Sequence, residues 1–73
     1  MDDLVFTVTT RSAPPLWMEQ WDVYTIFEAY TIYKDVKYMA WGTDEEEAKK
    51  KCVDLIKLDK VNGIVRNPGE VVE

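Results

Sequence analysis

One strongly marked helix limits this chain to folds in which a single helix covers a single sheet face. Thr43 and Glu46 form a Thr-x-x-Glu capping box, and acidic residues fill the first turn that follows. Ala48 and Cys52 then lie four residues apart on one side of the helix, as a buried stripe requires. The pattern predicts a helix over 44–58 in which the thiol of Cys52 is buried.

The rest of the chain, which we expect to be one domain over 1–73, is typical of strands and turns. Stretches rich in β-branched and aromatic residues alternate with breaks, of which Pro14 and Pro15 make the clearest. The predicted elements are strands at 3–9, 21–33 and 36–42, a proline-containing loop at 10–20, an optional short strand at 63–66 and a frayed tail at 70–73. Lys34 and Asp35 break the strand pattern, so we expect a tight hairpin across 33–36. The order β-β-β-α-(β) defines a two-layer α+β domain, with an antiparallel sheet of three or four strands and one helix packed on one face.

The second strand, 21–33, does not alternate as a half-buried strand should. By parity, Trp21 and Phe27 share one face, whereas Tyr24 and Tyr30 share the other. Both faces therefore carry large apolar groups, yet one helix covers only one of them. Two explanations stay open: the proline-containing loop folds back over the second face, or that face packs on another protein or on a second copy of this chain.

The negative charge of the chain gathers in the half that holds these aromatic groups. Residues 1–33 carry five acidic side chains against one basic side chain, whereas residues 34–73 carry nine against eight. Carboxylates interleaved with aromatic groups suit a basic, partly apolar site on another protein, and Trp and Tyr concentrate at the energetic centres of interfaces. The candidate binding residues are Trp17, Trp21, Asp22, Tyr24, Glu28 and Tyr30.

Missing residue types exclude most catalytic chemistry. The chain has no His and one Cys, so it has no Cys/His zinc site, no Ser–His or Cys–His dyad and no internal disulfide. We therefore expect no enzyme activity, no catalytic residue, no metal and no cofactor. Asp35 stands between Lys34 and Lys37, so nucleic-acid binding is not expected either. The acidic start at Asp2 and Asp3, and the lack of an apolar run of about 18 residues, favour a cytoplasmic protein without membrane contact.

Two resemblances make the binding hypothesis more specific. The run from Met39 to Ala48, a strand entering a Thr-capped helix, looks like part of HicB-type antitoxins, which are acidic β-β-β-α modules that block a small toxin. The chain has 33–36, Tyr-Lys-Asp-Val, where those proteins carry a Pro-Asp-Leu-Pro-Gly-type turn. In size, charge and element order the chain also resembles small phage-encoded inhibitors, such as anti-CRISPR proteins and inhibitors of host RNA polymerase.

These resemblances imply a leading function and an alternative. The leading one is a phage or mobile-element inhibitor that binds a host nucleic-acid-handling protein stoichiometrically, in the host cytoplasm. The alternative is an antitoxin-like regulatory module that neutralises a small partner. A second alternative, from a different class, is a sheet module that binds DNA, which would show itself by salt-dependent DNA binding.

Overall fold

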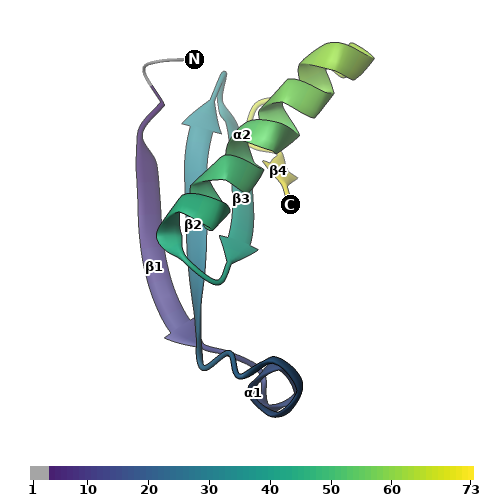
Figure 1. The fold of residues 1–73 in the computed structure, drawn as a ribbon. Helices are drawn as coiled ribbons and strands as arrows, with labels where there is room; N and C mark the ends of the chain where they lie inside the picture. Colours follow the sequence, from purple (N-terminus) through teal and green to yellow (C-terminus); the bar gives the residue numbers. More distant parts are fainter. Residues whose placement is uncertain (1–3) are drawn as a thin grey trace.

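Residues 4–73 are described by a computed structural model, which has a four-stranded sheet and two helices (Figure 1). The elements are β1 Phe6–Ser12, α1 Pro15–Trp21, β2 Thr25–Tyr33, β3 Val36–Gly42, α2 Glu45–Asn62 and β4 Val71–Val72. α2 packs on one face of the sheet, against β2 and β3. The predicted α+β class is therefore confirmed, and so is the strand predicted at 36–42. The second helix, α1, lies beyond the end of the sheet at which β1 stops (Figure 1).

The strands lie side by side in the order β1-β2-β3-β4, and the sheet is mixed rather than wholly antiparallel. β1 with β2 and β2 with β3 are antiparallel pairs, whereas β4 pairs parallel with Lys37 and Tyr38 of β3. The predicted hairpin between β2 and β3 is confirmed. Its two loop residues, Lys34 and Asp35, both have positive φ (50° and 65°), which is typical of a type I′ turn. The turn forms without the Asn-Gly or Asp-Gly pair that usually marks it.

α2 lies close to the sheet because small side chains line the contact. Ala29, Ala48 and Cys52 form a cluster there with none of their surface exposed. A Cβ atom on Gly42 would lie 2.8 Å from the backbone nitrogen of Ala48, so the end of β3 passes directly against the start of the helix. The Cys52 thiol donates to the Ala29 carbonyl oxygen at 3.1 Å, and burial raises its pKa. The prediction that Cys52 is buried is confirmed.

α2 begins one residue later than predicted and also runs further. Its N-cap is Asp44, whose carboxylate accepts from the Glu47 backbone N–H at 2.8 Å, while the Glu47 carboxylate accepts from the Thr43 backbone N–H at 3.3 Å. The acidic run offers two neighbouring cap residues, and the helix uses Asp44 rather than Thr43, so the predicted Thr43 cap is wrong. The helix continues because Asp59 extends the buried stripe, and it ends at Gly63 in the left-handed conformation.

The proline-containing segment is more ordered than predicted. The strand predicted at 3–9 is β1, which runs to Ser12; residue 3 lies outside the described part of the chain. The loop predicted at 10–20 is wrong, because it holds the end of β1 and most of α1. Pro15 occupies the first turn of α1, where its fixed φ suits a helix and its missing N–H has no helical partner to lose.

Two further boundaries differ from the prediction. β2 begins at Thr25, later than predicted, because Asp22 takes a left-handed conformation (φ 54°) that ends α1. Residues 63–66 form no strand, and the fourth strand comes instead from the segment predicted to fray. The Gly69 backbone N–H donates to the Asp35 carbonyl oxygen at 2.8 Å, which brings this segment beside the hairpin and lets β4 pair with β3.

The sheet face opposite α2 is not covered by a helix within the described residues (Figure 1). Ile32 on this face is 56% exposed, so the proline-containing segment does not fold back over all of it. Two cations cover aromatic rings there instead: the Arg11 guanidinium lies 4.5 Å from the Trp41 ring centroid, and the Lys37 ammonium lies 4.3 Å from that of Tyr30. Cation–π contacts and the apolar stems of these side chains therefore shield part of the face from water.

We predict that Asp44→Ala lowers the free energy of unfolding by about 0.5–2 kcal/mol, because the Glu47 N–H loses its acceptor in the first turn of α2. Thr43→Ala is the matched control, since the Thr43 hydroxyl makes only an exposed contact with the Glu47 carboxylate, at 3.2 Å. Urea denaturation followed by circular dichroism measures both. An equal or larger loss for Thr43→Ala would mean that Thr43 caps the helix after all.

Candidate functional site

Trp17 and Trp21 lie four residues apart in α1 and therefore face the same side of that helix. Their rings meet edge to face, with centroids 5.6 Å apart and planes inclined at 62°. Trp17 is half-buried and Trp21 is 59% exposed, and α1 has no buried residue at all. α1 thus presents two tryptophan rings that are not enclosed in the core.

A third tryptophan, Trp41 in β3, is held in place from two sides. Its indole N–H donates to the Glu28 carboxylate, with Nε1 and Oε2 2.8 Å apart. The Arg11 guanidinium lies over the ring and 3.9 Å from the same carboxylate oxygen. Glu28 and Trp41 are directly paired across β2 and β3, so the sheet register fixes this arrangement. The ring is oriented although Trp41 is 40% exposed.

The three tryptophans line a groove made of two adjoining hollows. The larger hollow, of about 640 Å³, lies between α2 and β3, and the smaller, of about 340 Å³, lies between α1 and the start of α2. Trp17, Trp41 and Lys51 line both. The larger hollow is also lined by Met39, Ala40, Asp54, Leu55 and Glu73. The smaller is also lined by Trp21, Val23, Gly42, Thr43 and Glu47. We call the two together the tryptophan groove.

Of the six predicted binding residues, only Trp17 and Trp21 line the tryptophan groove. Asp22 and Tyr24 lie between α1 and β2, where the Tyr24 hydroxyl donates to the Asp22 carboxylate at 3.3 Å. Because both precede the first residue of β2, the predicted parity over 21–33 does not apply to them. The prediction that Trp21 shares a strand face with Phe27 is wrong for the same reason, since Trp21 lies in α1.

Glu28 and Tyr30 do share the face opposite α2, as their spacing predicts. That face is not the acidic surface expected from the sequence. The Glu28 carboxylate is engaged by Trp41 and Arg11, and the Tyr30 ring lies under the Lys37 ammonium. The face therefore presents cations over aromatic rings, and the Glu28 carboxylate on it is already paired.

Sequence reasoning did not assign Trp41, Met39 or Lys51 to the site. Alternation along 36–42 places Met39 and Trp41 on one face, but it gives no sign that α1 lies beside the edge of β3. Lys51 pairs with Glu47 one turn earlier in α2, at 3.2 Å, and this contact lowers the pKa of Glu47. Its ammonium also donates to the Trp41 carbonyl oxygen at 3.1 Å, a contact that no local pattern predicts.

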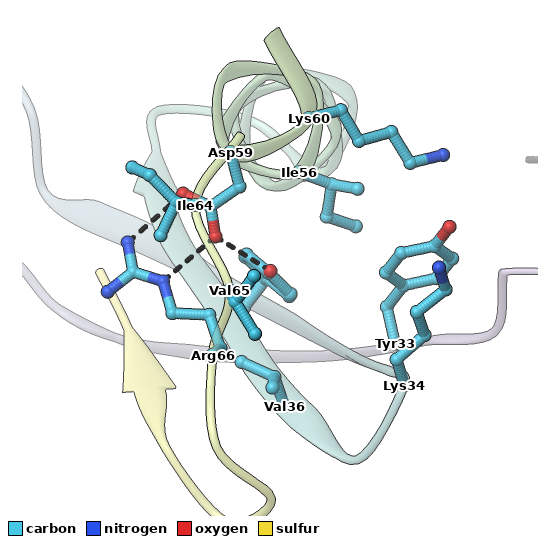
Figure 2. Close-up of a pocket in the computed structure, with 10 residues that line it drawn as sticks. Tyr33, Lys34, Val36, Ile56, Asp59, Lys60, Ile64, Val65 and Arg66 are labelled. Carbon is cyan, nitrogen blue, oxygen red and sulfur yellow. Dashed lines mark hydrogen bonds and ion pairs between the residues drawn. The ribbon is translucent and has the colours of Figure 1, made fainter. Parts of the chain in front are cut away.

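A separate hollow of about 220 Å³ lies between the end of α2, the hairpin and residues 64–66 (Figure 2). Its polar centre is Asp59, which is 6% exposed and accepts from the Tyr38 hydroxyl at 2.8 Å and from two nitrogens of Arg66 at 2.9 and 3.0 Å. Arg66 holds the pKa of Asp59 below its usual range, while burial raises the pKa of Tyr38. These contacts tie the chain after α2 to β3.

Two ammonium groups lie over Tyr33 at the rim of the same hollow. The Nζ atoms of Lys60 and Lys34 are 4.9 and 5.5 Å from the ring centroid (Figure 2). The nearby Lys60 ammonium is the main cause that lowers the pKa of the Tyr33 phenol. Both lysines are exposed, and the carboxylate in the hollow is already used by Arg66. We therefore regard this hollow as a structural joint.

No known protein family, curated protein or solved structure matches this chain. Between residues 4 and 73, no helix is long and apolar enough to cross a membrane. The same stretch contains no group of three or more His, Cys, Asp or Glu side chains placed to hold a metal ion. The fold and the groove together define a small two-layer α+β domain with an aromatic groove beside the partly unpaired side of β3.

We predict that Arg66→Gln lowers the urea midpoint at neutral pH and that the difference from the parent chain shrinks as the pH falls. The pKa of Asp59 is lowered in the folded state, so its contribution to stability is present above the ordinary Asp pKa and is lost as the pH falls through the folded-state pKa. Lys57→Gln serves as the control, because it removes an exposed charge from α2, the helix that holds Asp59. A difference that does not change with pH would contradict the assigned ion pair.

Proposed function

We propose that this chain is a non-catalytic protein-binding module that engages another protein through the tryptophan groove. The observation that carries the proposal is the convergence of Trp17, Trp21 and Trp41 from two separate elements on one groove. Tryptophan is the residue type most enriched at energetic hot spots of interfaces. An exposed cluster of large apolar groups is also a cost to a monomer in water, which a partner would remove.

The arrangement of the rings supports binding because little freedom remains to be lost. Trp41 is held by Glu28 and Arg11, and Trp17 and Trp21 pack against each other. Ordering a flexible side chain on binding costs about 0.5–1.5 kcal/mol, so rings that are already oriented contribute more of their burial to affinity.

The charges around the groove indicate what the partner presents. Glu47, Asp54 and Glu73 line it, against Lys51 alone among the cations. The Lys51 ammonium is already engaged by the Trp41 carbonyl oxygen and the Glu47 carboxylate. A partner segment with apolar side chains and Lys or Arg complements this surface, which agrees with the basic, partly apolar site expected from the sequence.

Stoichiometric inhibition of a host nucleic-acid-handling protein, as by a phage-encoded inhibitor, is the concrete form of this function that we favour. Neutralisation of a small toxin by an antitoxin-like module is the alternative. The first is a prediction from size, charge and element order, and the second is a prediction from the run Met39 to Ala48. Both require the same property, a groove that holds a partner protein without turnover.

We predict that Trp21→Ala weakens binding of the partner by about 30-fold or more, the equivalent of a hot-spot loss of about 2 kcal/mol. The partner is first captured from a lysate of the source cell with the parent chain and identified by mass spectrometry. Its affinity is then measured by calorimetry. Trp21 lies in a helix without buried residues, so the urea midpoint should barely change.

Two matched variants make this result decisive. Val61→Ala removes an apolar side chain that is 83% exposed at the far end of α2, and Ile32→Ala removes one from the sheet face opposite α2. Both should keep the affinity. Loss of binding in Ile32→Ala with no effect in Trp21→Ala would move the interface to the open sheet face. A dimer that Trp21→Ala dissociates, with no captured partner, would assign the groove to a second copy.

A further inference from the structure

β3 is paired along its whole length on one side but only in part on the other. β2 pairs with it from Val36 to Gly42. β4 pairs only with Lys37 and Tyr38, so the outer side of residues 39–42 has no strand beside it among the described residues. An unpaired strand edge presents backbone donors and acceptors that another strand can use.

The register of the hairpin shows which backbone groups face outward. In an antiparallel pair, the backbone N–H and C=O groups of successive residues point alternately toward the partner strand and away from it. Lys37 is one of those turned away, because its N–H donates to the Glu70 carbonyl oxygen at 3.0 Å. Two and four residues further on, the N–H and C=O groups of Met39 and Trp41 therefore also point outward. The Trp41 carbonyl oxygen accepts from the Lys51 side chain, which stands where a neighbouring strand would lie.

The larger hollow of the tryptophan groove runs along these same residues. Met39, Ala40 and Trp41 form its β3 side, and Leu55 is among the residues of α2 that form another. Its volume of about 640 Å³ is within the ~300–1,000 Å³ of typical ligand clefts. Glu73, directly after β4, also lines it, so the hollow continues from the position of β4 along the edge of β3.

We propose that the partner is bound by strand addition, with an extended segment of another protein lying beside Met39–Trp41 in line with β4. The proposal rests on the proposed function and specifies its binding mode. Backbone hydrogen bonds to Met39 and Trp41 supply affinity that does not depend on sequence, and alternate side chains supply specificity. Side chains turned toward α2 meet Ala40, Leu55 and Asp54, which suits the apolar stems and charged ends of Lys or Arg. Side chains turned the other way meet Met39 and Trp41, which suits apolar groups.

The parent chain allows a first test of the unpaired edge. Amide hydrogen exchange measured by NMR should be at least about tenfold faster at Trp41 than at Ala40, because the Ala40 N–H faces β2 and the Trp41 N–H has no strand to pair with. Protection of Trp41 equal to that of Ala40 would mean that the edge is already closed, and would overturn the proposal.

A covalently attached probe then tests whether the groove accepts a strand. The segment Val-Lys-Val-Lys is appended after Glu73, so that it continues β4 along β3 at a high effective concentration. By the register of β4, the first appended residue turns its N–H toward the Met39 carbonyl and its carbonyl toward the Trp41 N–H. We expect exchange at Trp41 to slow by about tenfold or more relative to the parent chain.

Two proline variants of the probe are matched controls. Proline at the first appended residue removes an N–H that faces β3, and protection of Trp41 should be reduced or lost. Proline at the second removes an N–H that faces away, and protection should remain. Equal exchange at Trp41 in the parent and in all extended chains would overturn strand addition.

The outcome separates this inference from the proposed function. An unprotected Trp41 in the extended chain, together with a Trp21→Ala variant that loses its partner, would overturn strand addition and leave the binding function standing. A protected Trp41 together with a Trp21→Ala variant that keeps its partner would support the strand site and reject the tryptophan assignment. Protection of Trp41 that grows with the concentration of the parent chain alone would assign the edge to a second copy and overturn a different partner protein.

Discussion

The close packing of α2 on the sheet sets the geometry of the rest of the molecule. Ala29 and Ala48 add almost no bulk between the helix and β2, and Gly42 lets the end of β3 lie against the helix start. Because α2 sits this close and along β3, Lys51 and Leu55 come to lie beside the strand edge. Larger side chains at this contact would push the helix outward and remove the wall of the tryptophan groove.

The parts of the fold that local interactions determine could be predicted from the sequence. The stripe through Ala48 and Cys52 gave α2, and the break at Lys34 and Asp35 gave the hairpin. The cap was misplaced by one residue because two possible cap residues, Thr43 and Asp44, stand side by side, each three residues before a Glu. α1 and β4 have seven and two residues, too few to show a hydrophobic period, and the position of β4 depends on a backbone contact of Gly69 far along the chain.

For the candidate site, the sequence indicated the types of residue involved but not which of them lie together. Trp17 and Trp21 were singled out because tryptophan concentrates at interfaces and both lie in the more acidic half of the chain, yet Trp17 was expected in a loop and Trp21 in a strand, whereas both lie in α1. Trp41 belongs to the site through contacts with Glu28 and Arg11, which come from two other strands. No pattern within one strand carries that information. The same pairing turned a face expected to be acidic into one on which cations cover aromatic rings, so charge counted along the sequence did not give charge in space.

α1 and β4 also bound the unpaired edge of β3 at its two ends. The open stretch from Met39 to Gly42 lies between Val72 on one side and Trp17 on the other, and at about 3.3 Å per residue it is roughly 13 Å long. The length of this stretch therefore limits the length of a guest strand that runs in line with β4. A short linear motif fits, whereas a long strand of a folded sheet collides with α1. The length of the peptide, as much as its sequence, would then distinguish partners from other exposed strands in the cell.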